Sequence, residues 1–343
     1  MTSNQAVAVY GAYGHTGRFV VAELSRRGWA PLLSGRDPVK LAALSAEHPG
    51  LALRVAASDD AAALDKALQG AVAVINCAGP FASTAAPLIE AALRTRIPYL
   101  DVAAEIEANI DTLTQFADRA RDAGIVVVPA MAFYGGLGDL LATAAMGDWA
   151  AADEISIAYG LDSWLPTAGT LVAGQVSRQR RDGRRLVFDE GKLAYATGAA
   201  PAAVWTFPQP LGMQPVIAEF TMADTATISH HIKTPEIRSY MTVSAVKDLT
   251  SPNQKAPTAS DNSGRSSQTF VVEVVVRRGS DERRAAASGR DIYAFTAPLV
   301  VEAMERVVSG QVKKSGVFTA GEAFDAREFL ATLDPEHLAV EIR

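Results

Sequence analysis

The chain has 343 residues, enough for more than one compact domain, and 49% of them are hydrophobic and 20% charged, which excludes an intrinsically disordered protein. A formal net charge of −6 and a pI of about 5.5 argue against general affinity for nucleic acid or anionic membranes. We therefore expect neither among its partners.

The start of the chain and its cysteine content indicate a cytoplasmic protein. The first five residues are uncharged and lead directly into an apolar run, without the basic start and long apolar stretch of a secretory signal. No apolar run approaches the roughly 18 residues of a membrane-spanning helix. The single cysteine, Cys77, has no partner for an internal disulfide and cannot form a multi-thiolate zinc site, so we expect a reducing compartment.

The first third of the chain alternates β-branched runs with amphipathic stretches, the pattern of parallel βαβ units. We predict strands at Ala6–Tyr10, Pro31–Ser34, Leu53–Ala56, Ala73–Asn76, Tyr99–Val102 and Ile125–Pro129. We predict helices at Thr16–Arg27, Pro38–Glu47, Ala61–Gln69, Ala85–Arg94 and Glu107–Ala123. The fold class is therefore α/β, with an N-terminal Rossmann domain on a doubly wound parallel sheet over residues 1–135.

The pattern changes after about residue 135, where strand-like segments are separated by long irregular connections. These segments predict a second, α+β domain on a mixed or antiparallel sheet, with strands at Glu154–Tyr159, Leu186–Asp189, Val216–Met222, Ile237–Val243, Phe270–Arg277 and Arg284–Arg290. Residues Ser251–Ser267 are rich in Pro, Ser, Asn and Gly, which predicts a mobile loop. Helical periodicity returns at Ala297–Val308 and Ala326–Leu333.

A glycine-rich segment with the spacing GxxGxxG joins the first strand to the first helix. Its glycines let the chain reverse, let backbone approach a pyrophosphate and let helix pack tightly on strand, while the helix N-terminus supplies N–H donors. Because the segment opens a βαβ unit, it predicts a dinucleotide site formed by Gly11, Tyr13, Gly14, His15, Thr16 and Gly17.

The end of the second strand bears on the choice between NAD and NADP. An NAD site usually has an acidic residue there that holds the ribose 2′-hydroxyl. Here Arg36 occupies that place, and a guanidinium suits a 2′-phosphate, to which Ser34 could add a hydroxyl donor. We therefore predict NADP. The alternatives are that Arg36 is a surface arginine before a helix, or that Asp37 permits NAD.

The fourth strand ends in a second cofactor-side segment. Its small residues allow backbone contact with the ribose and nicotinamide, and we assign Cys77, Ala78, Gly79 and Pro80 to the cofactor site. Asn76 can fasten neighbouring loops. Cys77 is either an inert small residue or a nucleophile, and a lone buried cysteine is more often inert.

Taken together, these motifs resemble the saccharopine dehydrogenase-like (saccharopine reductase-like) oxidoreductases. The resemblance is strongest over residues 6–145 and touches both ends of the chain. It rests on Gly11–Gly17 with Arg18, Ser34–Arg36, Asn76–Phe81, Tyr99–Glu105, Val128–Phe133 through Gly138–Leu140, Gly289–Tyr293 and Gly316–Thr319.

The resemblance implies three parts: the Rossmann domain, an inserted substrate and dimerisation domain over residues 136–292, and C-terminal helices over residues 293–343 that pack back on the first domain. It also implies NADPH-dependent reduction of a C=N, C=O or conjugated C=C bond, and we expect a small-molecule substrate and a homodimer. Two departures prevent transfer of the substrate. The chain is shorter than the saccharopine-forming enzymes, and Ala132–Asp139 replaces the family's Gly-Phe-Asp-Ser-type loop.

Other mechanisms fit poorly. No tyrosine has a lysine four residues later, as short-chain dehydrogenases require, and no two histidines have helical metal-ligand spacing, so we expect no metal. His230 and His231 would point to opposite faces of an extended segment.

Hydride transfer needs an aligned acceptor and often a hydrogen-bond donor for the developing charge. The catalytic candidates are Tyr134, Tyr99 and His230. Asp139 most simply caps the helix Leu140–Met146, and Glu105 the start of its own helix. A nonenzymatic NADP(H) sensor and an inactive scaffold are the rival functions.

Overall fold

The computed structural model describes residues 5–333 and 338–343, which fall into two compact units. Unit 1 consists of Met1–Ala132 and Thr296–Phe318, and unit 2 of Phe133–Phe295 and Thr319–Arg343. Each unit has its own β-sheet. His337, one of the histidines considered as metal ligands, lies outside the described residues.

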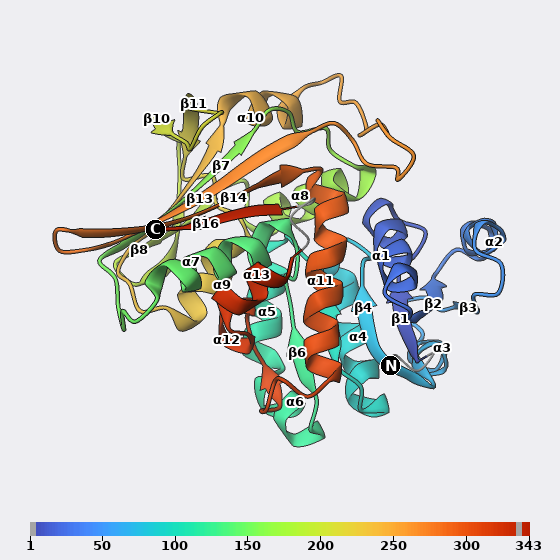
Figure 1. Ribbon diagram of the computed structural model, residues 1–343. Helices are drawn as coiled ribbons and strands as arrows, with labels where there is room; N and C mark the ends of the chain where they lie inside the picture. The colour runs from blue at the N-terminus through green and yellow to red at the C-terminus, as the bar shows by residue number, and fades with distance from the viewer. Residues whose placement is uncertain (1–4, 334–337) are drawn as a thin grey trace. The chain divides into compact units, whose positions relative to one another are not determined.

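The sheet of unit 1 is parallel, with the strand order β15-β6-β5-β4-β1-β2-β3 (Figure 1). Six of these strands follow the order of a doubly wound dinucleotide-binding fold, which confirms the predicted Rossmann class. The register aligns the carboxyl ends of the central strands, because Tyr10 pairs with both Ser34 and Asn76, and Asn76 pairs with Asp101. The strands are β1 (Ala6–Tyr10), β2 (Ala30–Gly35), β3 (Leu53–Val55), β4 (Ala71–Asn76), β5 (Tyr99–Asp101), β6 (Val126–Val128) and β15 (Gly316–Val317).

The helices of unit 1 bury the apolar residues of this sheet. A hydrophobic cluster joins Tyr10, Val74, Tyr99 and Val127 of the strands to α3 (Ala61–Leu68), α4 (Phe81–Thr95), α5 (Ile106–Gln115) and α6 (Ala117–Ala123). Two further helices, α1 (His15–Arg26) and α2 (Pro38–Glu47), pack against β1, β2 and β3.

Helix α11 (Ile292–Val308) runs beside α1 in Figure 1, and its residues from Thr296 onward belong to unit 1. Arg27 bridges the two helices through ion pairs to Glu302 at 2.7 Å and Glu305 at 2.6 Å.

Two helices of unit 1 differ from prediction. The segment expected as one helix over Glu107–Ala123 is two helices, because the backbone at Phe116 departs from helical geometry (φ −111°, ψ −6°). Helix α4 begins at Phe81 rather than Ala85, because the Glu105 carboxylate accepts hydrogen bonds from the N–H groups of Phe81 at 2.6 Å and Ala82 at 3.0 Å.

Unit 2 is built on a mixed sheet in the order β10-β11-β12-β7-β13-β14-β16, with β8 paired to β12 and β9 paired to β8. Strands β12 and β7 are parallel, and the other neighbours are antiparallel, which confirms the expected mixed sheet. The strands are β7 (Glu154–Leu161), β8 (Arg185–Asp189), β9 (Lys192–Ala196), β10 (Ala202–Thr206), β11 (Met213–Ala218), β12 (Ile237–Thr242), β13 (Thr269–Arg278), β14 (Asp281–Arg290) and β16 (Leu338–Ile342).

Helices occupy several connections of unit 2 that were expected to be irregular. The predicted strand Val216–Met222 ends at Ala218, and Met222 is instead the N-cap residue of α9. Helix α7 packs against β13 and β14 and is buried along nearly its whole length. The helices are α7 (Gly138–Met146), α8 (Ala168–Arg180), α9 (Ala223–His231), α10 (Val243–Thr250), α12 (Ala320–Ala323) and α13 (Ala326–Thr332).

The C-terminal segment also differs from expectation. Residues 293–343 were expected to form helices on the Rossmann domain, but only residues 296–318 belong to unit 1. Beyond Phe318 the chain belongs to unit 2, because β16 forms an antiparallel ladder with β14 and α12 and α13 pack against α7.

Candidate functional site

The glycine loop after β1 has no room for side chains. Gly11 has a φ of +81°, and a Cβ there would lie 2.8 Å from the Ala78 nitrogen. A Cβ at Gly17 would lie 2.3 Å from the Gly11 carbonyl oxygen. Gly14 is the N-cap residue of α1 and makes no side-chain cap, so the first turn of α1, which includes His15 and Thr16, directs backbone N–H groups out of the helix end. This is the geometry that binds a pyrophosphate.

The loop is fastened to the neighbouring strands at their carboxyl ends. The Gly11 N–H donates to the Ser34 carbonyl at 2.8 Å, and the Cys77 N–H donates to the Tyr10 carbonyl at 2.7 Å. The structure therefore brings together the predicted cofactor segments at Gly11–Gly17, Ser34 and Cys77–Pro80.

The residues at the end of β2 and directly after it separate into buried and exposed groups. Ser34 is fully buried, and its hydroxyl donates to the Arg54 carbonyl at 3.0 Å, so this geometry does not support its role as a 2′-phosphate donor. Arg36 is exposed and makes no hydrogen bond or ion pair with the described part of the chain. Asp37 caps α2 by accepting from the Val39 and Lys40 N–H groups. The Lys40 ammonium lies 5.7 Å from the centre of the Tyr13 ring, which adds a second cation beside this strand end.

A buried polar network underlies the loop after β4. The Asn76 side-chain amide donates to the Tyr99 hydroxyl at 3.1 Å, and its oxygen accepts from the Ala78 N–H at 3.0 Å. Tyr99 in turn donates to Asp101 at 2.8 Å. Burial raises the pKa of Asp101 to about 6, although N–H groups of Ala130 and Ala103 donate to it and oppose the rise. Tyr99 is thus engaged within this network and shapes the loop rather than facing a ligand.

The motifs at Asn76–Phe81 and Tyr99–Glu105 form one connected structure. Asn76 joins Tyr99, and Glu105 holds the start of α4 instead of capping its own helix, where it makes no side-chain cap. Cys77 lies in the first of these motifs and is partly exposed. Burial of the thiol, and to a smaller extent the charge of Asp101, raises the pKa of Cys77. A protonated thiol is a poor nucleophile, which supports the inert interpretation of Cys77.

Tyr134 lies in unit 2, in the kinked segment Phe133–Leu137, where the backbone of Tyr134 is non-helical (φ −93°, ψ 117°). Its side chain is 5% exposed and its ring packs against Tyr159 and Trp164, with ring centres 5.0 and 5.1 Å away. Burial raises the pKa of Tyr134 well above its ordinary value, as do Tyr293 and Asp224 to a smaller extent. The phenol therefore stays protonated near neutral pH and can donate a hydrogen bond.

Asp224 is a site residue that the sequence did not reveal. It lies in the first turn of α9, is 1% exposed, and accepts the Gly135 N–H at 2.9 Å. Burial raises its pKa to about 6, while the neighbouring Tyr159 hydroxyl and the hydrogen bond from the Gly135 N–H oppose the rise. A single aspartate in a threonine-rich segment matches no motif, so no sequence signal marked it.

His230 and His231 end α9 and bind different carboxylates, which corrects the extended geometry assumed for them. His230 Nδ1 lies 3.0 Å from Glu322, and His231 Nε2 lies 2.6 Å from Asp139. Asp139 is the second residue of α7 and does not cap that helix, because its other oxygen accepts the Gly321 N–H at 2.8 Å. The two histidines link α7, α9 and α12, so the His230 side chain is engaged in a structural contact with Glu322.

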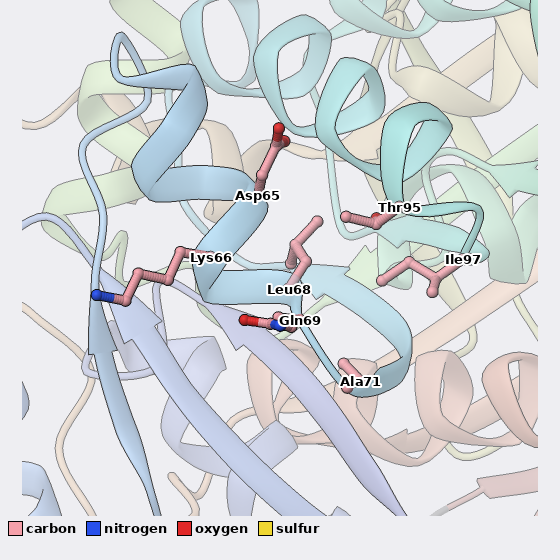
Figure 2. Close-up of a pocket in the computed structure, with 8 residues that line it drawn as sticks. Asp65, Lys66, Leu68, Gln69, Ala71, Thr95 and Ile97 are labelled. Carbon is pink, nitrogen blue, oxygen red and sulfur yellow. The ribbon is translucent and has the colours of Figure 1, made fainter.

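A separate cavity of about 450 Å³ lies at the amino ends of β4 and β5. Figure 2 shows the apolar side chains of Leu68, Ala71 and Ile97 converging there, with Asp65 and Lys66 on the α3 side. The glycine loop lies at the opposite, carboxyl end of the same sheet, so this cavity is not part of the cofactor site.

Residues 5–333 and 338–343 contain neither a metal-ligand cluster nor a helix that could span a membrane. No three His, Cys, Asp or Glu side chains group as metal ligands do. None of the helices described combines the length and apolar character that crossing a membrane requires.

Residues 7–128 match the family model of the saccharopine dehydrogenase NADP-binding domain. This match confirms the resemblance over the segment that holds the glycine loop, Arg36 and the Asn76–Phe81 motif. NADP is therefore the cofactor of this domain.

Two known proteins are also similar to part of this chain. A probable mitochondrial saccharopine dehydrogenase-like oxidoreductase of Arabidopsis thaliana is 30% identical over 142 residues, covering 37% of this chain and 31% of that protein. The human saccharopine dehydrogenase-like oxidoreductase is 26% identical over 145 residues, covering 37% and 34%. The matched part thus spans about a third of the length of these relatives.

A solved structure has the same fold over the whole chain. The apo, histidine-tagged saccharopine dehydrogenase (L-Glu forming) of Saccharomyces cerevisiae gives a TM-score of 0.66 at 12% identity, covering 99% of this chain and 100% of that one. This likeness confirms the α/β fold class with its second mixed sheet.

Proposed function

We propose, from the saccharopine dehydrogenase-type NADP-binding domain of residues 7–128, that this protein transfers hydride between NADP(H) and a small molecule. The reaction reduces a C=N, C=O or conjugated C=C bond with NADPH or, in the reverse direction, forms such a bond with NADP⁺. The observation that carries the proposal is the glycine loop, which packs tightly against Ala78 and leads directly into the first turn of α1, together with Arg36, which follows β2.

The residues present fit the cofactor. Gly11 and Gly17 allow the tight turn that packs the loop against Ala78 and α1 against the loop, and the first turn of α1 would offer its N–H groups and positive dipole to the pyrophosphate. Arg36, exposed and without an ion-pair partner in the described chain, would hold the 2′-phosphate. When bound, NADPH supplies the hydride. The protein's remaining task is to orient the acceptor and stabilise its developing charge.

We assign that stabilising hydrogen bond to Tyr134. Strand β6 ends at Val128 and this part of unit 1 ends at Ala132, so Tyr134 follows soon after the carboxyl end of β6 in the sequence. Its phenol is protonated near neutral pH, because burial raises its pKa well above the ordinary value. A protonated phenol can donate to an oxygen or nitrogen that gains negative charge as hydride arrives.

Replacing Tyr134 tests this assignment. We expect Tyr134→Phe to lower kcat by roughly a hundredfold, as loss of one such donor typically does, and to leave NADPH affinity unchanged. Steady-state kinetics and a fluorescence titration measure the two quantities. Tyr195→Phe is the control, since Tyr195 is 48% exposed on β9. Wild-type turnover by Tyr134→Phe on the true substrate would rule Tyr134 out as the donor.

The proposal as a whole is tested by NADPH oxidation against a panel of imines, ketones and enones. Turnover with any class supports an oxidoreductase and names the bond. Tight NADPH binding without turnover across the panel would favour the alternative, a nonenzymatic NADP(H) sensor that uses the same loop.

Assembly and location complete the proposal. We infer a homodimer that works in the cytoplasm, where the lone Cys77 would remain reduced. The Arabidopsis relative is described as mitochondrial, so cell fractionation is an informative test. Light scattering on the purified protein gives the mass of the assembly.

A further inference from the structure

Three buried polar atoms belong to side chains that pack together in unit 2. They are the hydroxyl oxygens of Tyr134 and Tyr159 and the Oδ2 atom of Asp224, and these side chains are 5%, 0% and 1% exposed. None of the three atoms has a well-aligned hydrogen-bond partner among the residues that the structure describes. A buried polar atom without a partner is destabilising, so three of them on neighbouring side chains indicate a functional arrangement.

Asp224 also fixes the backbone next to Tyr134. Its Oδ1 atom accepts the Gly135 N–H, the amide directly after the Tyr134 Cα, at 2.9 Å. The Thr227 hydroxyl donates to the Gly135 carbonyl at 3.4 Å, so α9 holds this residue from both sides. Gly135 has a φ of +114°, which favours glycine, and the contact therefore maintains an unusual backbone conformation.

The space around Asp224 is closed by a second glycine. A Cβ at Gly138 would lie 2.0 Å from Asp224 Oδ1 and 3.1 Å from the Tyr159 hydroxyl. The carboxylate and this phenol are thus neighbours against the start of α7. The Tyr134 ring packs against Tyr159 and Trp164, and the peptide that follows Tyr134 is held by Asp224.

We propose that Asp224 is a positioning residue for Tyr134: it anchors the peptide after Tyr134 and, with the Tyr159 hydroxyl, sets which way the Tyr134 proton points. This inference rests on the proposed function, in which Tyr134 donates to the reacting group. When ionised, Asp224 accepts a hydrogen bond from Tyr159 and leaves the Tyr134 hydroxyl free to donate. When protonated, Asp224 donates to a phenol oxygen and this orientation is lost.

The surroundings give this arrangement a pH dependence. Three titratable groups face Asp224: Tyr159 of β7, Asp139 of α7, and Tyr134 in the segment before α7. Tyr293 in turn faces Tyr134. Asp139 is itself paired with His231. Burial raises the pKa of Asp224 to about 6, so turnover is expected to rise as pH increases through this value.

A double-mutant cycle tests the coupling. Asp224→Asn keeps an oxygen for the Gly135 N–H but cannot ionise. We expect it to lower kcat about tenfold through misplacement of Tyr134, to leave the KM for NADPH unchanged, and to remove the rise in kcat near pH 6. In a Tyr134→Phe background the same change should have less than about a twofold effect. The inference would be overturned if the two substitutions lowered kcat by independent factors that multiply in the double variant. It would also be overturned if kcat of Asp224→Asn still rose near pH 6.

A measurement without substrate separates this inference from the proposed function. The protein has four tryptophans, and 5-fluorotryptophan labelling gives each a fluorine NMR signal, with Trp164→Phe identifying Trp164. Because the Tyr134 ring lies 5.1 Å from Trp164, we expect that signal to shift with a midpoint near pH 6 and to stay constant in Asp224→Asn.

Asp248→Asn is the control, since Asp248 accepts the backbone N–H of Trp164 at 3.0 Å and should not set the midpoint. A shift that depends on Asp224 in a protein without turnover would contradict the proposed function and retain the positioning role. A signal that does not titrate, or that titrates equally in Asp224→Asn, would overturn the positioning role whether or not turnover is found.

Discussion

Two side chains at the end of β2 and directly after it, Ser34 and Arg36, belong to one sequence motif but differ in burial. Ser34 and Arg36 both suit a 2′-phosphate in chemistry, but Ser34 donates within the sheet whereas Arg36 faces outward. Asp37, which left NAD open as an alternative, uses its carboxylate to cap α2. Of the three, Arg36 is the side chain available to a bound nucleotide.

We therefore expect NADPH to bind at least tenfold more tightly than NADH, since one charged contact of about 1.5–3 kcal/mol suffices for that ratio. Arg36→Ala should erase most of this preference and leave NADH affinity nearly unchanged. Fluorescence titration measures both affinities. Arg121→Ala, at an exposed arginine of α6, is the matched control. Equal affinities for the two cofactors in the unmodified protein would contradict the assignment of Arg36.

At the scale of elements, the predictable parts are those whose packing leaves a pattern in the sequence. The Rossmann strands are buried runs separated by amphipathic helices, so their order could be predicted. Helix α8 has one buried residue, Ser177, and α9 is rich in threonine, so neither shows an apolar stripe. The early start of α4 depends on Glu105, which is distant in sequence and therefore leaves no local signal.

The link between α7, α9 and α12 has a pH dependence that can be measured. Burial lowers the pKa of His231, but Asp139 raises it by more through charge and hydrogen bonding, so the net shift is upward. The stabilisation is therefore complete below the ordinary histidine pKa of about 6.5 and is lost as pH rises through the higher folded value.

His231→Gln should consequently lower the free energy of unfolding by about 1–3 kcal/mol at pH 6, and by less at pH 9. Urea unfolding at the two pH values measures the difference. His48→Gln, at the C-cap of α2, controls for loss of a histidine elsewhere. Equal losses at both pH values would show that the His231 charge is not involved.

At the scale of the whole molecule, each sheet is completed by residues distant in sequence, and this could not be predicted from local patterns. Strand β15 joins β6, and β16 joins β14, although both strands are short or partly exposed. The segment Ser251–Ser267 has no helix or strand, as its composition predicts, and its mobility stays a prediction.

Hydrogen exchange across the molecule tests that mobility. We expect rapid amide exchange throughout Ser251–Ser267, because few apolar groups there offset the entropy of ordering. Slower exchange is expected at Ser263 and Arg265, whose N–H groups donate to Asp261. Protection equal to that of β1 or β4 would show that the segment packs as an ordered element.

The chain's passage between its two units has a consequence for its synthesis. The ribosome releases β1 to β6 early, but the edge beside β6 remains open until Gly316–Val317 emerges. Unit 2 likewise lacks the partner of β14 until Leu338–Ile342 is made. Neither unit can complete its sheet until the last part of the chain has been translated. Both nascent sheets therefore carry an unpaired edge that a chaperone would have to shield.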